Sequence, residues 1–108
     1  MIAREWKARC PLAHKQGFID HLYQTGVKET SETIGFQGAQ ILTRDLEFSV
    51  EITLISYWEN LEQITAFAGD DISIARLYPE DDKYELDPDH FVTHYQVVEN
   101  RWVGETKS

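Results

Sequence analysis

The sequence predicts an α+β domain whose elements follow the order β-α-β-β-α-β. Three observations carry this prediction. Residues alternate between polar and apolar near the start, two adjacent segments in the middle are rich in β-branched and aromatic residues, and a segment of helical spacing lies on either side of that pair. The order is that of the ferredoxin-like arrangement, in which an antiparallel four-stranded sheet carries both helices on one face.

The first strand and the first helix are expected within the first 27 residues. Residues 2–9 alternate and place four side chains on one face of a strand: Ile2, Arg4, Trp6 and Ala8. Pro11 follows at a position where a helix can begin, because the first helical turn does not need its N–H. Apolar residues then recur at helical spacing, at Leu12, Ile19, Leu22, Tyr23 and Val27. Gly26 is expected to end this helix or to bend it.

The remaining elements follow from similar patterns. Residues 36–44 and 49–58 favour strands, and the few residues between them suit a hairpin. Asn60 can cap a second helix, with Leu61, Ile64 and Phe67 on its buried side. After Gly69, a short helical piece is expected to start at Asp70 and Asp71, to carry Ile72, Ala75 and Arg76, and to end at Pro79. Residues 80–89 form an acidic connector, and residues 91–98 form the last strand.

The size and composition of the chain limit its class. The 108 residues suit one domain, which we place at residues 1–100, followed by a C-terminal tail at residues 101–108. Ten Lys and Arg against 19 Asp and Glu give a net charge of -9, which repels nucleic acids and anionic membranes. No stretch approaches the length of a membrane span. The single Cys10 and an N-terminus without an apolar signal run indicate a cytoplasmic protein.

The faces of the sheet predict a homodimer. The strand at residues 49–58 places Ile52, Leu54, Ser56 and Trp58 on one side and Glu51, Thr53, Ile55 and Tyr57 on the other. Neither side is simply polar, so a monomer with one bare face would expose a large apolar patch. Two sheets packed face to face would remove that exposure.

The sequence also resembles the antibiotic-biosynthesis-monooxygenase-like proteins. The likeness spans residues 2–98, and its best local signature is Ser56-Tyr57-Trp58-Glu59 followed by the helix that contains Ala66-Phe67. The runs 67–71 and 78–82 and the strand 94–98 are similar to an uncharacterised bacterial branch. The resemblance implies a dimeric α+β barrel built on the ferredoxin-like arrangement.

Two branches of this family suggest reactions. The heme-degrading branch uses an Asn on the first strand, a Trp in the second helix and a His soon after it. This chain has no Asn on that strand, Phe67 in that helix and no His at residues 69–78, so heme degradation is disfavoured. The branch that oxidises aromatic polyketides without a cofactor uses cavity Trp, Asn, Tyr and Arg residues. The chain contains these residue types but not at positions that can be matched.

Three candidate site residues, Arg4, Trp6 and His94, lie on the first and last strands. His94 lies in an otherwise apolar strand, where it could act as a general acid or base or could simply have a hydrogen-bond partner. Arg4 could bind an anionic or enolate group while Trp6 stacks on a flat ring, or Arg4 could pair with a core carboxylate. His14, His21 and His90 are expected at the surface or at the ends of elements.

The acidic segment 80–89 is expected to be a solvated loop. Its spacing fits no calcium site, so no metal is predicted. If this loop covers the mouth of a barrel, Tyr78 would face the cavity, and Asp81 or Asp82 could pair with Arg4 or Arg76. We therefore expect His94 and Arg4 as catalytic residues and Trp6 and Tyr78 as substrate-binding residues.

Two functions remain open from the sequence. The first is a cofactor-independent monooxygenase that acts on a small aromatic compound in a barrel cavity. The second is a non-catalytic dimeric module for small-molecule binding or stress response. A connected cavity with convergent polar groups favours the enzyme, and a filled interior favours the module.

Overall fold

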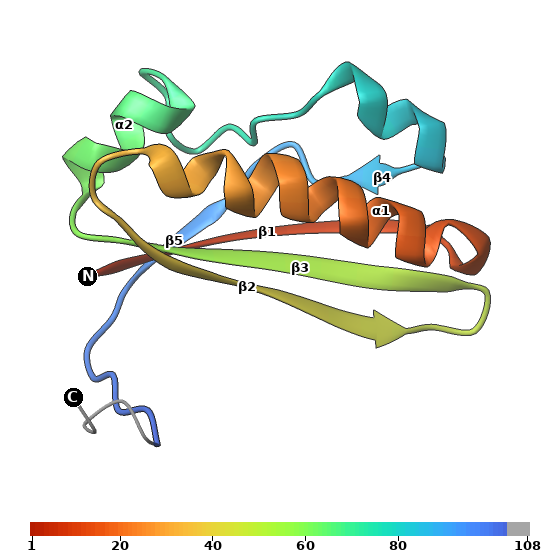
Figure 1. The fold of residues 1–108 in the computed structure, drawn as a ribbon, viewed down its shortest axis with the longest axis horizontal. Coiled ribbons are helices and arrows are strands. Elements are labelled where there is room, and N and C mark those ends of the chain that lie inside the picture. Colours follow the sequence, from red (N-terminus) through yellow and green to blue (C-terminus); the bar gives the residue numbers. More distant parts are fainter. Residues whose placement is uncertain (104–108) are drawn as a thin grey trace.

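The structure is a computed structural model that describes residues 1–103. Three long strands form the body of one antiparallel sheet: β1 (Ile2–Pro11), β2 (Phe36–Asp45) and β3 (Ser49–Trp58). Two short strands, β4 (Asp87–Pro88) and β5 (Thr93–Gln96), both pair with the free edge of β1. The order β2-β3-β1 followed by β4 and β5 places β1 inside the sheet, with the helices on one side (Figure 1). The predicted ferredoxin-like fold class is confirmed, but the sheet has five strands and not the predicted four, because two short strands share the edge of β1.

The strand register fixes which side chains share a face. Arg4 pairs with Ser56 on β3 and with His94 on β5, so all three project from the helix-covered face. On β1 this face is almost closed to solvent, with Ile2 8%, Arg4 5% and Ala8 0% exposed. The alternation predicted for residues 2–9 is therefore present, and β1 extends two residues further.

The first helical segment starts later than predicted. Pro11 is the last residue of β1, and a 3-10 turn (Leu12–His14) precedes the α-helix α1 (Lys15–Leu22). The chain then continues as a π-helix (Tyr23–Lys28), so Gly26 lies inside a helical segment and does not end one, and a 3-10 turn (Thr30–Glu32) follows. Because of the later start, Phe18 becomes the most buried residue of α1, whereas Leu12 and Tyr23 are exposed.

The second helix, α2 (Leu61–Ala68), has the predicted cap. The Asn60 side chain accepts a hydrogen bond from the Gln63 N–H, and Gly69 ends the helix with a φ of 91°. The short helix predicted after Gly69 is wrong. The Asp71 carboxylate instead binds the N–H and hydroxyl of Ser73, a local turn that competes with helix formation.

The acidic connector is more ordered than predicted. A 3-10 helix (Pro79–Tyr84) forms at its start, and the two residues of β4 pair with Ala8 and Arg9. An isolated bridge joins Ile74 to Phe91, and the last strand is four residues long. The segment after β5 then runs away from the sheet (Figure 1).

Two apolar clusters pack between the sheet and the helices. The first joins α1 to the first half of β3 through Phe18, Leu22, Val50 and Ile52, and it contains the buried Cys10. The second joins α2 to the sheet end through Ile2, Trp58 and Ile64. Trp58 is fully buried, and its indole N–H donates to the Ser56 hydroxyl at 2.9 Å. Both clusters border the candidate site.

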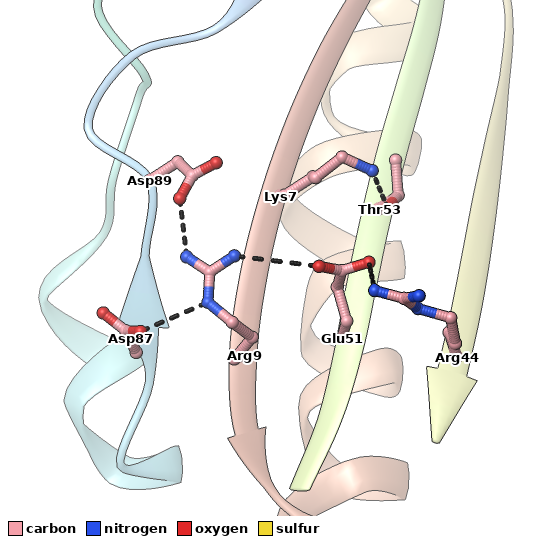
Figure 2. A network of polar contacts seen from close by, with 7 residues as sticks. All are labelled: Lys7, Arg9, Arg44, Glu51, Thr53, Asp87 and Asp89. Atoms are coloured by element: carbon pink, nitrogen blue, oxygen red, sulfur yellow. Dashed lines mark hydrogen bonds and ion pairs between the residues drawn. The ribbon is translucent and has the colours of Figure 1, made fainter. Parts of the chain in front are cut away.

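The opposite face of the sheet carries a network of charges. Arg9 binds Asp87 and Asp89 on one side and Glu51 on the other, and Arg44 of β2 also binds Glu51 (Figure 2). The same face carries a largely uncharged group at the other end of the strands, comprising Ala3, Ile55, Tyr57 and Tyr95. The charged Glu5 lies beside this group, where it pairs with Ile55 across the strands and accepts a hydrogen bond from the Tyr95 hydroxyl. No helix among residues 1–103 is long and apolar enough to cross a membrane.

Candidate functional site

A cavity lies between the sheet and the helical layer, where the two apolar clusters meet. Its apolar walls come from β1, α1, β3 and α2 and from the segment before β5: Trp6, Phe18, Leu22, Leu54, Phe67 and Val92. Its polar groups are Arg4, Thr25, Arg76, Tyr78 and Asp81. The cavity therefore combines ring-shaped apolar surfaces with charges of both signs.

Arg4 supplies a buried positive charge to this cavity. Its side chain donates to the backbone oxygens of Ile72 and Ile74, and its Nη1 lies 3.0 Å from Nε2 of His94. Burial lowers the pKa of Arg4 to about 10, so the guanidinium is still protonated at neutral pH. The predicted alternative, an ion pair with a core carboxylate, is wrong, because no carboxylate among residues 1–103 forms an ion pair with Arg4.

His94 contacts the site through Arg4. It is the cross-strand neighbour of Arg4, but it is not part of the cavity wall. An arginine has no acceptor, so His94 Nε2 must accept the hydrogen bond and Nδ1 must carry the proton. Burial, and then the charge of Arg4, lower the pKa of His94 and favour this neutral form.

Arg76 and Tyr78 form the outer wall. The Arg76 guanidinium lies 5.0 Å from the centre of the Phe67 ring and 5.7 Å from that of Tyr78. Arg4 lies 5.8 Å from the same Phe67 ring, so two guanidinium groups flank one aromatic side chain. Burial raises the pKa of Tyr78, which keeps its hydroxyl protonated.

Asp81 is the carboxylate of the cavity wall, and His21 holds it in place. The two side chains are 11% and 14% exposed, and His21 Nε2 lies 2.9 Å from Asp81 Oδ1. The second carboxylate oxygen accepts from the Tyr78 N–H at 3.0 Å. The sequence suggested that Asp81 or Asp82 pairs with Arg4 or Arg76, and this is wrong. Among the described residues Asp81 pairs with His21, and Asp82 forms no ion pair.

Trp6 completes the inner wall. Its indole N–H donates to the Asp89 backbone oxygen at 2.8 Å, which fixes the ring, and its centre lies 6.4 Å from that of Phe18. The structure thus brings three of the four predicted site residues, Arg4, Trp6 and Tyr78, to one cavity. His94, the fourth, is next to them.

Sequence reasoning missed the role of His21. The residue was expected at the surface or at an element end, but its ring packs against Phe18 and Tyr84 with centres 6.0 and 5.4 Å apart. A signal was present, because His21 lies three residues after Phe18 and one before Leu22, on the buried side of α1. The three-residue spacing of Tyr78 and Asp81 also fits a carboxylate that caps a helical turn.

The cavity is small. It encloses about 50 Å³, enough for about three or four water molecules, whereas an engineered protein cavity that binds benzene encloses roughly 150 Å³. A ring can therefore enter only if a wall moves. Arg76 is the exposed member of that wall, and its side chain is held by one hydrogen bond, to the Phe67 oxygen at 3.2 Å.

The part of the chain that the structure describes contains no set of metal ligands. There, no three His, Cys, Asp or Glu side chains lie close enough to hold a metal ion. The defined features are a buried guanidinium, aromatic walls and a fixed carboxylate. The chain is thus an α+β domain with an internal cavity that is mostly apolar and contains charged groups.

The comparisons with known proteins agree with this architecture. No protein-family model matches the chain, and no curated protein matches it. Among solved structures, it resembles a candidate antibiotic biosynthesis monooxygenase from Bacillus cereus, with a TM-score of 0.63 and 13% identity over 94% of this chain and 98% of the other. A second candidate of that kind, from Deinococcus radiodurans, gives 0.56 and 14% over 95% and 98%.

A third similar structure is the heme degrader MhuD from Mycobacterium tuberculosis, solved with two hemes in its active site. Its TM-score is 0.58 at 16% identity, over 94% of this chain and all of the other. The chain therefore has the fold of the antibiotic-biosynthesis-monooxygenase-like proteins, as its sequence suggested. At these identities the likeness concerns the fold alone.

Proposed function

We propose that this protein binds a small planar organic anion in the cavity and that the ligand is an aromatic compound oxidised without a cofactor. The observation that carries the proposal is the buried Arg4, whose charge no carboxylate among residues 1–103 neutralises. Such a charge is costly to bury. A bound anion would compensate it, and the rings of Trp6 and Phe67 would contact a flat ligand.

The chemistry that suits these residues starts from an anion. Arg4 would stabilise a phenolate or enolate, the electron-rich form that reacts with dioxygen. In the balanced reaction a CH₂ group of the substrate becomes a carbonyl group. One oxygen atom of O₂ enters the substrate, and the other leaves as water with the two hydrogens. His94 would act as a positioning residue that holds Arg4.

Heme does not fit the residues present. Cofactor sites usually enclose 300 Å³ or more, and this cavity encloses about 50 Å³. The Nε2 atoms of His21 and His94 are also engaged, with Asp81 and Arg4.

A homodimer is part of the proposal. The uncharged group on the open face (Ala3, Ile55, Tyr57 and Tyr95) would pack against the same group of a second copy, with the Arg9 network at its margin. In such an isologous interface the same surface patch of each subunit packs against that of the other.

The small volume of the cavity favours a second candidate function, a non-catalytic binding module. Only a small ligand fits without movement, and turnover would require the outer wall to open for each substrate. The two functions share the same anion site. Oxygen consumption separates them, because the enzyme consumes O₂ with hydroxylated aromatic compounds that carry a CH₂ group on the ring system, and the module does not.

The binding proposal is tested by nuclear magnetic resonance titration with benzoate and its neutral analogue benzyl alcohol. We expect benzoate to shift the indole N–H signal of Trp6 and to bind at least about tenfold more tightly than the alcohol, because a charged hydrogen bond contributes about 1.5–3 kcal/mol. Arg76→Gln should weaken benzoate binding, and Arg101→Gln, at an exposed position outside the cavity, should not. Equal binding of acid and alcohol, or no binding of either, contradicts the proposal.

A further inference from the structure

The remaining hydrogen-bonding capacity of Arg4 indicates how an anion would bind. A guanidinium has five N–H groups, and three of those of Arg4 are used, by the oxygens of Ile72 and Ile74 and by His94. Within residues 1–103 the Nε–H and one N–H of Nη2 have no partner. Among residues 1–103, every side-chain nitrogen or oxygen that is fully buried has a hydrogen-bond partner. Because Nε of Arg4 has no partner, it is not fully buried and a ligand can reach it. Two nitrogens of one fork can bind both oxygens of a carboxylate.

Asp81 contributes a negative charge to the cavity, opposite in sign to that of Arg4. It lies in the same cavity wall, its side chain is 11% exposed, and among the described residues its one side-chain partner is His21. Its two oxygens each accept one hydrogen bond from the protein, at 2.9 and 3.0 Å, and a carboxylate has about four acceptor positions. Capacity therefore remains for a donor that belongs to a ligand.

The two charges together discriminate between anions. A simple carboxylate gains the attraction of Arg4 and Arg76 but also lies in the field of Asp81. A ligand that donates a hydrogen bond to Asp81 turns that unfavourable contact into a favourable one. Sites built around a hydrogen bond reject analogues that lack the donor, because a buried polar group is then left unpaired.

Building on the proposed function, we propose that the cavity selects planar acids that also carry a hydroxyl group. Arg4 binds the acidic oxygens, and Asp81, oriented by His21 and the Tyr78 N–H, accepts a hydrogen bond from the hydroxyl. Asp81 is thus the specificity-determining residue of the site. Hydroxylated aromatic acids are the ligand class.

The test compares benzoate with the three hydroxybenzoates and the three methoxybenzoates, in titrations of the full chain. We expect at least one hydroxybenzoate to bind at least about tenfold more tightly than benzoate, in keeping with one hydrogen bond to a charged group. The methoxy analogue of the same substitution should lose this gain, because it has no hydrogen to donate.

Asp81→Asn tests the residue itself. The amide keeps the size of the side chain but removes the charge. In this variant the hydroxybenzoate should therefore bind only about threefold more tightly than benzoate, or less, while benzoate itself still binds. Asp82→Asn, a neighbouring change at an exposed position, should keep the full gain. Binding of benzoate and each hydroxybenzoate with equal affinity, or an unchanged gain in Asp81→Asn, overturns this inference and leaves the proposed function intact. Absence of any carboxylate binding to the unmodified protein overturns the proposed function itself.

Discussion

Arg4 and His94 face each other across the β1–β5 pairing, with Nη1 of the arginine 3.0 Å from Nε2 of the histidine. Arg4 can only donate, so the contact requires a neutral imidazole. Protonation of His94 would place two positive donors against each other. The orientation of Arg4 in the cavity therefore depends on the protonation state of a residue behind it.

This relationship predicts a pH effect on stability. Burial and Arg4 hold the pKa of folded His94 below its ordinary value of about 6.5, so the unfolded chain binds more protons in that window. The stability contributed by neutral His94 is complete above pH 6.5 and is lost as the pH falls toward the folded pKa. In urea titrations, the decrease in unfolding free energy from pH 7.5 to 5.5 should be smaller in His94→Gln, whose amide oxygen accepts from Arg4 without titrating.

His90→Gln is the matched control, because His90 is exposed. It should keep the pH dependence of the unmodified protein. Benzoate affinity should follow the same pattern, weakening at pH 5.5 in the unmodified protein and changing less in His94→Gln. His94→Ala, which removes the acceptor, should weaken binding at both pH values, and unchanged binding there argues against any role of His94 in the site.

The sequence predicts those features of the site that depend on neighbouring residues, and it does not predict contacts between residues far apart in the chain. The alternation of β1 placed Arg4 and Trp6 on one buried face, because period-two patterns depend only on neighbouring residues. The partners of Arg4 could not be predicted, since Ile72 and Ile74 are 68 and 70 residues away in a segment whose local turn the pattern misjudged. The His21–Asp81 contact spans 60 residues and was missed for the same reason.

Two histidine–carboxylate pairs among residues 1–103 provide a second prediction. His21–Asp81 is 14% and 11% exposed, whereas His14–Glu85, at 3.0 Å, is 33% and 72% exposed. Removing a partner from a buried pair leaves an uncompensated polar group, whereas exposed pairs contribute little. His21→Ala should lower the unfolding free energy by about 2 kcal/mol or more, and His14→Ala by about 1 kcal/mol or less.

Because His21 also packs on Phe18 and Tyr84, the pair itself is measured by a double-mutant cycle with Asp81→Ala. A coupling energy of about 1 kcal/mol or more is expected. Additive losses from the two substitutions would show that packing, and not the hydrogen bond, stabilises this contact.

Gly26 provides a way to reduce the cavity without touching its charges. A Cβ at this position would lie 2.9 Å from the ends of the Leu22 and Leu54 side chains, both of which line the cavity. These flexible ends must shift in Gly26→Ala, at a cost of about 1–3 kcal/mol for an overpacked interior. Benzoate binding should weaken by about tenfold. Gly38→Ala, where a Cβ meets no atom within 4 Å, is the control and should bind normally.

The open face of the sheet carries the last prediction. Ile55 lies beside Glu5 and Gln40 at the level of the uncharged group, and a single chain leaves it half-exposed. If two copies pack through this group, Ile55→Lys places a charge in the centre of the interface, where removing that charge from water costs several kcal/mol, which an ion pair with the neighbouring Glu5 offsets only in part. In sedimentation experiments the dimer dissociation constant should rise by about 100-fold or more, which corresponds to about 2.7 kcal/mol.

The control for this change is Ile34→Lys, an equally drastic substitution at a position that is 80% exposed in the turn before β2. It should leave the sedimentation behaviour unchanged. The monomer produced by Ile55→Lys should keep its fold, because the lysine can extend into solvent when no partner covers the face. An unmodified protein that sediments as a monomer at micromolar concentration would rule out the dimer, and the apolar part of the open face would then have to be covered in some other way or remain exposed.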